Sequence, residues 1–166
     1  AGRATSVSPK FQLGPALVEA GYTQQKPKGA TESDTAFDFG AIVDLKSVKL
    51  AAAFARVANG ASEALVKGNK KKYDRIHLGG TVPLGNFSLL ASWNYSKDKN
   101  SLNDKASQIG IGGTYDFSKR TTFYAAYATI DTKAGANASK NYQVYDATND
   151  AYGYRRGVNV GFYHTF

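Results

Sequence analysis

The chain has 166 residues, of which 42% are hydrophobic and 13% aromatic, so it is too apolar to be a disordered tail. It contains no Cys, which excludes a disulfide framework, a thiolate metal site and a cysteine nucleophile. Its 21 Lys and Arg against 13 Asp and Glu give a formal charge of +8, which fits nucleic acid, anionic lipid or anionic solutes as partners.

Hydrophobic and polar residues alternate along most of the chain, as is typical of strands with one apolar and one polar face. The pattern is weak in TSVSPKFQL, ALVEAGYTQ and VKLAAAFA, and clear in AFDFGAIVDL and YDRIHLGGTVP. It is clearest in FSLLASWNYS and continues in QIGIGGTYDF, TTFYAAYATI and the C-terminal GVNVGFYHTF. We predict about nine strands, near residues 4–13, 16–25, 35–45, 48–58, 72–83, 86–97, 105–117, 121–131 and 154–166.

The connections between these strands alternate between two lengths. Short turns are expected at GP, KS, LGN and SKR, and longer polar loops separate them. Strands of ~10 residues with tight turns at one end and long loops at the other are typical of an outer-membrane β-barrel. Phe87, Leu45 and Phe117 lie near the turn ends, whereas Tyr22, Phe37 and Tyr95 lie near the loop ends, which predicts two aromatic girdles. The longest uncharged apolar run, LAAAFA, is too short for a membrane helix.

Two segments carry a family resemblance. YDFSKRTTFYAAYA (Tyr115 to Ala128) and the terminal GVNVGFYHTF closely resemble the last three strands of the general trimeric porins of β-proteobacteria, with Phe117 in place of the usual Leu. The resemblance implies a 16-stranded, water-filled, trimeric pore in the outer membrane of a Gram-negative bacterium. It also implies that the terminal strand, through Phe166 with His164, Phe162 and Val160, carries the signal read by the barrel-assembly machinery.

The chain is about half as long as a complete porin of this family. If Phe166 lies at the periplasmic rim, nine strands place Ala1 at the extracellular side, whereas complete bacterial barrels have an even strand number. We therefore expect residues 1–166 to form a single domain that is the C-terminal portion of a larger barrel, cut in an outer loop. About seven N-terminal strands would come from a separate piece or chain.

In a barrel, the polar faces of the strands line the lumen. A positive excess on such a wall favours anions, and facing rows of opposite charge orient water and small ions. A solvated wall residue is the plainer interpretation of any one of these side chains, and Arg75 is the strongest individual candidate because it lies away from a strand end. The predicted pore-lining residues are Lys10, Lys49, Arg75, His77 and Arg155, with Glu19, Asp38, Asp44 and Asp116 opposite them.

The remaining charges are harder to place. The run KGNKKK, with Lys67, Lys70, Lys71 and Lys72, is predicted in an outer loop, where it could bind lipopolysaccharide phosphates, concentrate anions or act only as a solubilising run. Arg56 shares the lipid side with Phe54 by parity, so it would have to snorkel to the headgroups or follow a bulge. The aromatic-rich segment from Asn141 to Tyr154 is expected to be a surface loop.

Three functions remain compatible with the sequence. The first is a passive diffusion porin that prefers small anionic solutes, assembled as a homotrimer, without a cofactor, a metal, catalysis or a nucleic-acid partner. The second is a soluble basic β-barrel that binds nucleic acid through KGNKKK and exposed tyrosines, although it leaves the apolar strand faces unexplained. The third is a small closed outer-membrane barrel that acts as an adhesin or an enzyme. His77 and His164 show no metal-ligand spacing, and no catalytic pair is visible.

Overall fold

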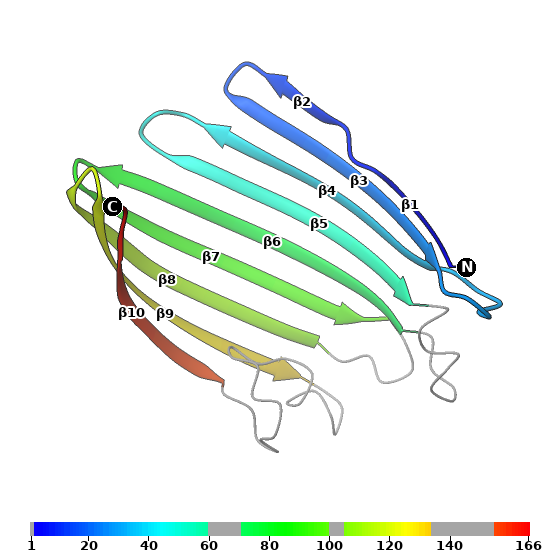
Figure 1. Cartoon of the computed structure of the whole chain (residues 1–166). Helices are drawn as coiled ribbons and strands as arrows, with labels where there is room; N and C mark the ends of the chain where they lie inside the picture. Colours follow the sequence, from blue (N-terminus) through cyan, green and yellow to red (C-terminus); the bar gives the residue numbers. More distant parts are fainter. Residues whose placement is uncertain (1, 60–70, 100–104, 134–154) are drawn as a thin grey trace.

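The chain folds as one curved antiparallel β-sheet (Figure 1). The computed structural model describes residues 2–59, 71–99, 105–133 and 155–166. No helix in this part of the chain is long and apolar enough to cross a membrane. The strands are β1 (Arg3–Val7), β2 (Lys10–Leu13), β3 (Ala16–Lys26), β4 (Asp34–Asp44), β5 (Lys49–Asn59), β6 (Lys71–Leu84), β7 (Phe87–Asp98), β8 (Lys105–Ser118), β9 (Thr121–Lys133) and β10 (Arg156–His164).

The expected meander is confirmed, since from β3 onward each strand pairs with the next one along the chain. The first predicted strand is interrupted, because β1 and β2 both pair with β3 and are separated at Ser8 and Pro9. Proline has no backbone N–H to donate, so it is confined to edge strands and interruptions of this kind. Only its carbonyl is used here, and it accepts from the amide of Ala20 at 3.2 Å.

The short connections are the predicted tight turns, and they lie at one end of the sheet (Figure 1). Gly14, Lys46 and Gly85 adopt positive φ angles of 59°, 66° and 65° at three of these turns. Glycine takes this conformation at no steric cost, whereas Lys46 is held there by the Asp44 carboxylate, which accepts from its amide at 2.9 Å. Arg3 pairs with Lys26 at the opposite end, and His164 pairs with Thr121 beside the turns. Both edge strands therefore run from the loop end to the turn end.

The two faces of the sheet differ in character. The exposed large hydrophobic side chains of the described strands lie almost all on one face, where Phe39, Leu78 and Ile109 are 47%, 47% and 57% exposed. Ile42, Leu90 and Tyr163 are the exceptions, on the face that carries His77 and Gln108. The predicted girdle residues Tyr22, Phe37, Phe87 and Phe117 are exposed on the apolar face, as the alternation indicated.

The strands are staggered around the sheet. One row of paired residues starts at Asp44, the last residue of β4, and passes through Lys49 and Thr81 to Gly112. Thr81 lies inside β6, and Gly112 lies further still from the end of β8 at Ser118. Each successive hairpin is therefore shifted along its neighbour in the same direction, as strand tilt in a barrel requires.

The predicted strand ends lie within two residues of the observed ones, and two of the small differences concern predicted site residues. The final strand spans Arg156–His164 rather than 154–166, and only the Thr165 amide continues the pairing, by donating to the carbonyl of Arg120 at 2.9 Å. Phe166 is fully exposed beyond the strand, with its ring edge-on to His164 at 4.9 Å. Lys71 and Lys72 belong to β6 rather than to a loop, because their pairing with Asn59 and Ala58 extends the β5–β6 ladder. Lys67 and Lys70 lie outside the described residues.

Candidate pore wall

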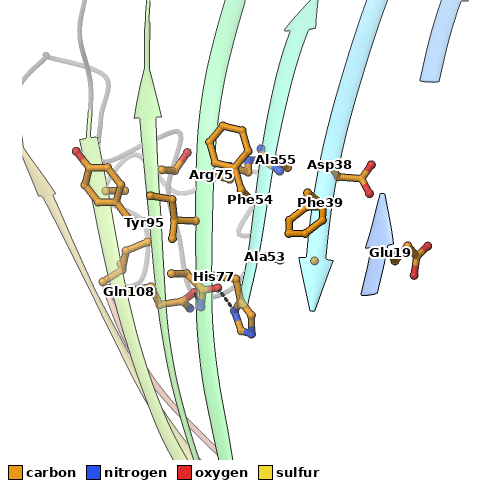
Figure 2. A pocket seen from close by; sticks show the side chains of 16 residues that line it. Glu19, Asp38, Phe39, Ala53, Phe54, Ala55, Arg75, His77, Tyr95 and Gln108 are labelled. Atoms are coloured by element: carbon orange, nitrogen blue, oxygen red, sulfur yellow. Dashed lines mark hydrogen bonds between the residues drawn. The ribbon is translucent and has the colours of Figure 1, made fainter. Parts of the chain in front are cut away.

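The polar face of the sheet is the concave one. A hollow of about 500 Å³ is lined by residues of seven consecutive strands, which only the inner side of a curved sheet allows. Figure 2 shows Arg75 and His77 on β6 lying between the acids Glu19 and Asp38 on one side and Gln108 on the other. A second hollow of about 590 Å³ also touches His77 and extends to Lys49 and Thr81 near the tight turns. The two hollows share His77 and form one trough, whose charged and polar groups gather toward the loop end, whereas small and apolar residues line much of its turn end.

The register places the predicted pore-lining residues on this concave face, except Arg155, which lies just before β10 and outside the register. Lys10 and Glu19 are directly paired and form an ion pair at 3.1 Å, and Lys49 forms another at 3.1 Å with Asp44. Asp116 accepts from the Thr122 hydroxyl at 2.5 Å. Lys10, Lys49 and their two acids are therefore partly neutralised on the same wall, whereas Asp116 is bound by a neutral hydroxyl.

Arg75 differs from the two paired lysines in having only short side chains as register partners. Its register partners are Ala55 on β5 and Ser96 on β7, which are too short to cover the guanidinium. The guanidinium lies over the Tyr73 ring with its carbon 5.9 Å from the ring centroid, and the residue is exposed. A cation held over an aromatic face keeps its charge and its remaining donors available to solutes. Arg155 is also exposed, and its carbonyl accepts from the amide of Ile130 at 2.8 Å.

A chain of side-chain hydrogen bonds crosses three strands beside Arg75. His77 Nδ1 and Asn94 Oδ1 are 2.7 Å apart, and Asn94 Nδ2 donates to Gln108 Oε1 at 3.4 Å. The three residues are direct register partners on β6, β7 and β8. Because each of the three residues has a partner among the others, their side chains are held in place and still present polar atoms to the hollow.

Asn94 and Gln108 were not predicted as site residues. The alternation puts each of them on the polar face of its strand, so parity was a usable signal. Their meeting with His77 depends on the register across two hairpin connections, which alternation within one strand does not determine.

The Asp38 carboxylate lies against a glycine on the neighbouring strand. Gly21 is the register partner of Asp38, and a β-carbon on Gly21 would overlap the Asp38 carboxylate. Gly21 is buried under this side chain. The acid therefore lies flat along the wall rather than projecting across the hollow.

Arg56 is a charged residue that the alternation places on the apolar face of the sheet. The β5–β6 register is continuous, so Arg56 does not follow a bulge. The register pairs it with Asp74, so its side chain has an acidic partner. Its Nε and Nη2 donate to the two carboxylate oxygens of Asp74 at 2.7 and 2.9 Å, and Lys99 reaches the same carboxylate at 3.2 Å. Its guanidinium also lies 5.7 Å from the Phe54 ring centroid. Sequence analysis missed Asp74 as the partner, because the loop between the two strands hid their register.

Within the described residues, no three His, Cys, Asp or Glu side chains gather as a metal site would require. The segment from Asn141 to Tyr154, predicted as a surface loop, lies outside the described residues.

Comparison with known proteins agrees with this geometry. The family model of Gram-negative porins matches residues 1–135. Among solved structures, the chain is similar to the anion-selective porin from Comamonas acidovorans, with a TM-score of 0.78 and 21% identity over 99% of this chain and 49% of that one. It is also similar to the in-vitro folded trimer form of OmpT, an outer membrane protein of Vibrio cholerae, with a TM-score of 0.71 and 14% identity over 99% of this chain and 56% of that one. No curated protein matched.

At these identities the structural matches show a shared fold, and the chain spans about half the length of both solved proteins. The family match covers most of the sequence. The chain therefore belongs to the Gram-negative porin family and is a protein of the outer membrane.

Proposed function

We propose that this chain forms part of the wall of a water-filled channel through which small hydrophilic solutes and ions diffuse passively, with a preference for anions. The observation that carries this proposal is the separation of the two faces. The charged and polar side chains that line the trough come from β3 to β8 and lie on the concave face among alanines and glycines, whereas nearly all exposed large apolar side chains of the strands lie on the convex side. A wall of this kind keeps a lumen wet while its outside contacts lipid.

The anion preference rests on charge placement. Lys10 and Lys49 are paired with acids, whereas Arg75 stands between short side chains on the central strand β6, at the loop-side end of the trough. A charge on the wall of a narrow aqueous channel acts on ions at short range and in a lower effective dielectric than bulk water. The similar porin from Comamonas acidovorans is described as anion-selective, which supports the same direction.

The complete channel needs further strands. In the described structure the sheet has two edges, formed by β1 with β2 and by β10, and both run from the loop end to the turn end. An antiparallel barrel therefore closes only if an odd number of additional strands joins these edges, and a second copy of this sheet would pair in parallel. Seven further strands satisfy this condition and give a 16-stranded barrel, with this chain as its C-terminal portion.

The assembly partners follow from the same proposal. The barrel forms a homotrimer in the outer membrane, next to lipopolysaccharide. The terminal strand carries the assembly signal, with Phe166 exposed at the turn end and Phe162 and Val160 exposed on the convex face. Replacing Phe166 by Ser should slow membrane insertion in cells, and unchanged insertion kinetics would contradict this role.

Selectivity can be tested by reversal potentials in planar bilayers under a salt gradient. Arg75→Glu in the assembled channel should shift the reversal potential toward cations. Lys28→Glu makes the same charge change in a loop at the outer end, where screening over ~8 Å at physiological salt weakens its effect on the lumen. An equal shift from both variants would assign selectivity to the loops, and the absence of conductance in the unaltered assembly would overturn the channel itself.

A further inference from the structure

A row of charged residues crosses the convex face at the loop end of the sheet. The register aligns Arg56 on β5, Asp74 on β6, Lys97 on β7 and Lys105 on β8, so that each is the direct partner of the next. The row continues on the other side through Phe37 and Tyr22. Directly paired residues stand about 5 Å apart between their β-carbons. These four charged groups therefore form one compact line beside the outer aromatic residues.

The charges in the two halves of this row are compensated to different extents. Arg56 and Lys99 both bind the Asp74 carboxylate, so the one acid in the line is already shared between two cations. Among the described residues, Lys97 and Lys105 form no ion pair. Lys133 is the next register partner of Lys105, and Asp131 is the nearest further acid on the same face of β9.

Adjacent lysines in direct register repel one another. Like charges placed directly opposite each other on neighbouring strands are destabilising. Lys97 and Lys105 are both half-buried, so water screens them less than it would screen fully exposed side chains. A ligand that bears at least two negative charges would remove this repulsion.

The position of Lys97 and Lys105 on the sheet restricts the kind of ligand that can reach them. The row leaves the apolar band as it approaches the loop end, because Arg56 lies inside β5 whereas Lys105 is the first residue of β8. On the convex side of an outer-membrane barrel, this level faces the headgroups of the outer leaflet. A phosphomonoester carries a charge of about −1.5 to −2 at neutral pH, which matches two adjacent lysines, whereas a phosphodiester carries about −1.

We propose that Lys97 and Lys105, with Lys99 beside them, bind a phosphomonoester on the saccharide anchor of lipopolysaccharide. The site lies on the wall of the barrel, at the ends of β7 and β8. The inference rests on the proposed orientation of the chain in the outer membrane, and it names the residues that hold the lipid.

The experiment measures lipid binding to the assembled porin in detergent by native mass spectrometry. The probes are bis-phosphorylated lipid A, its dephosphorylated form and phosphatidylglycerol. The variant K97Q/K105Q removes the pair, and the control K26Q/K28Q removes the same charge from the same end of the sheet, several strands away. K97Q/K105Q should weaken binding of the bis-phosphorylated lipid about tenfold or more, since each lysine contributes a charge-assisted hydrogen bond.

The control should change this affinity less than about twofold, and the dephosphorylated lipid should bind all three proteins weakly and equally. Unchanged affinity in K97Q/K105Q would overturn the site, and so would an equal loss of phosphatidylglycerol binding. Channel conductance, measured on the same preparations, separates the two proposals. If the K97Q/K105Q channel conducts and binds the lipid as tightly as the original protein, only the lipid site is overturned. If the original protein, without substitutions, does not conduct, the porin function is overturned.

Discussion

The concave and convex faces share every backbone hydrogen bond of the sheet but meet their surroundings in opposite ways. On the concave face, His77, Asn94 and Gln108 satisfy one another, whereas on the convex face Ile109 and Ile111 are 57% and 51% exposed with no protein over them. Ala106 and Ile130 are the only buried hydrophobic residues in the described part of the chain. The fold therefore has almost no core of its own, and its apolar surface is matched to lipid instead of to a second layer of protein.

The largest effect should come from placing a charge on the lipid side. Ile111→Arg, in the middle of β8, should lower the free energy of unfolding by about 2–4 kcal/mol, the cost of an arginine at the bilayer midplane. Thr114→Arg on the concave face of the same strand should change it by less than about 0.5 kcal/mol. Urea unfolding of the assembled barrel in lipid vesicles, followed by tryptophan fluorescence, compares the two. Equal destabilisation would mean that the concave face is not in water.

A smaller effect is expected where the convex face already carries charge. Arg56→Ala leaves the Asp74 carboxylate, whose side chain is 15% exposed, with Lys99 as its remaining cation. We expect a loss of stability smaller than that of Ile111→Arg, and partial recovery in R56A/D74A, because the acid then no longer needs a partner. A double-mutant cycle from urea midpoints measures the coupling. Additive losses would show that the pair makes no net contribution.

The smallest effect tests how the trough holds its acids. Gly21→Ala places a methyl group where the Asp38 carboxylate lies, and the carboxylate can rotate away, so the stability loss should stay below about 1 kcal/mol. The displaced acid should move the reversal potential slightly toward cations. Gly40→Ala is the control, because its nearest contacts are ordinary ones, at 3.5 Å to Ala53 and 3.6 Å to the carbonyl of Ala52. If both alanines give the same reversal potential, the glycine does not position Asp38.

Alternation within single strands was enough to predict the meander and the faces on which Arg75 and Arg56 lie, and the short connections predicted the tight turns. It could not predict contacts between strands, because a register shift leaves the pattern inside each strand unchanged. For this reason His77 was identified without Asn94, and Arg56 without Asp74. The break at Pro9 was missed because the residues on both sides still alternate, and only the missing N–H marks the interruption. The role of the concave residues in permeation stays a prediction.

The stagger of the hairpins has a consequence for solutes. A constant shift from hairpin to hairpin means that the strands are inclined to the barrel axis, by about 35–45° in barrels of this type. A row of paired residues then follows a helical path around the lumen, so its members lie at different heights along the barrel axis. On the row that runs from Glu19 through His77 to Gln108, the acid lies closest to the turn end and the amide closest to the loop end. A solute entering from the loop side would meet neutral amides first, the imidazole next and the carboxylate last, so each group would act on it at a different depth.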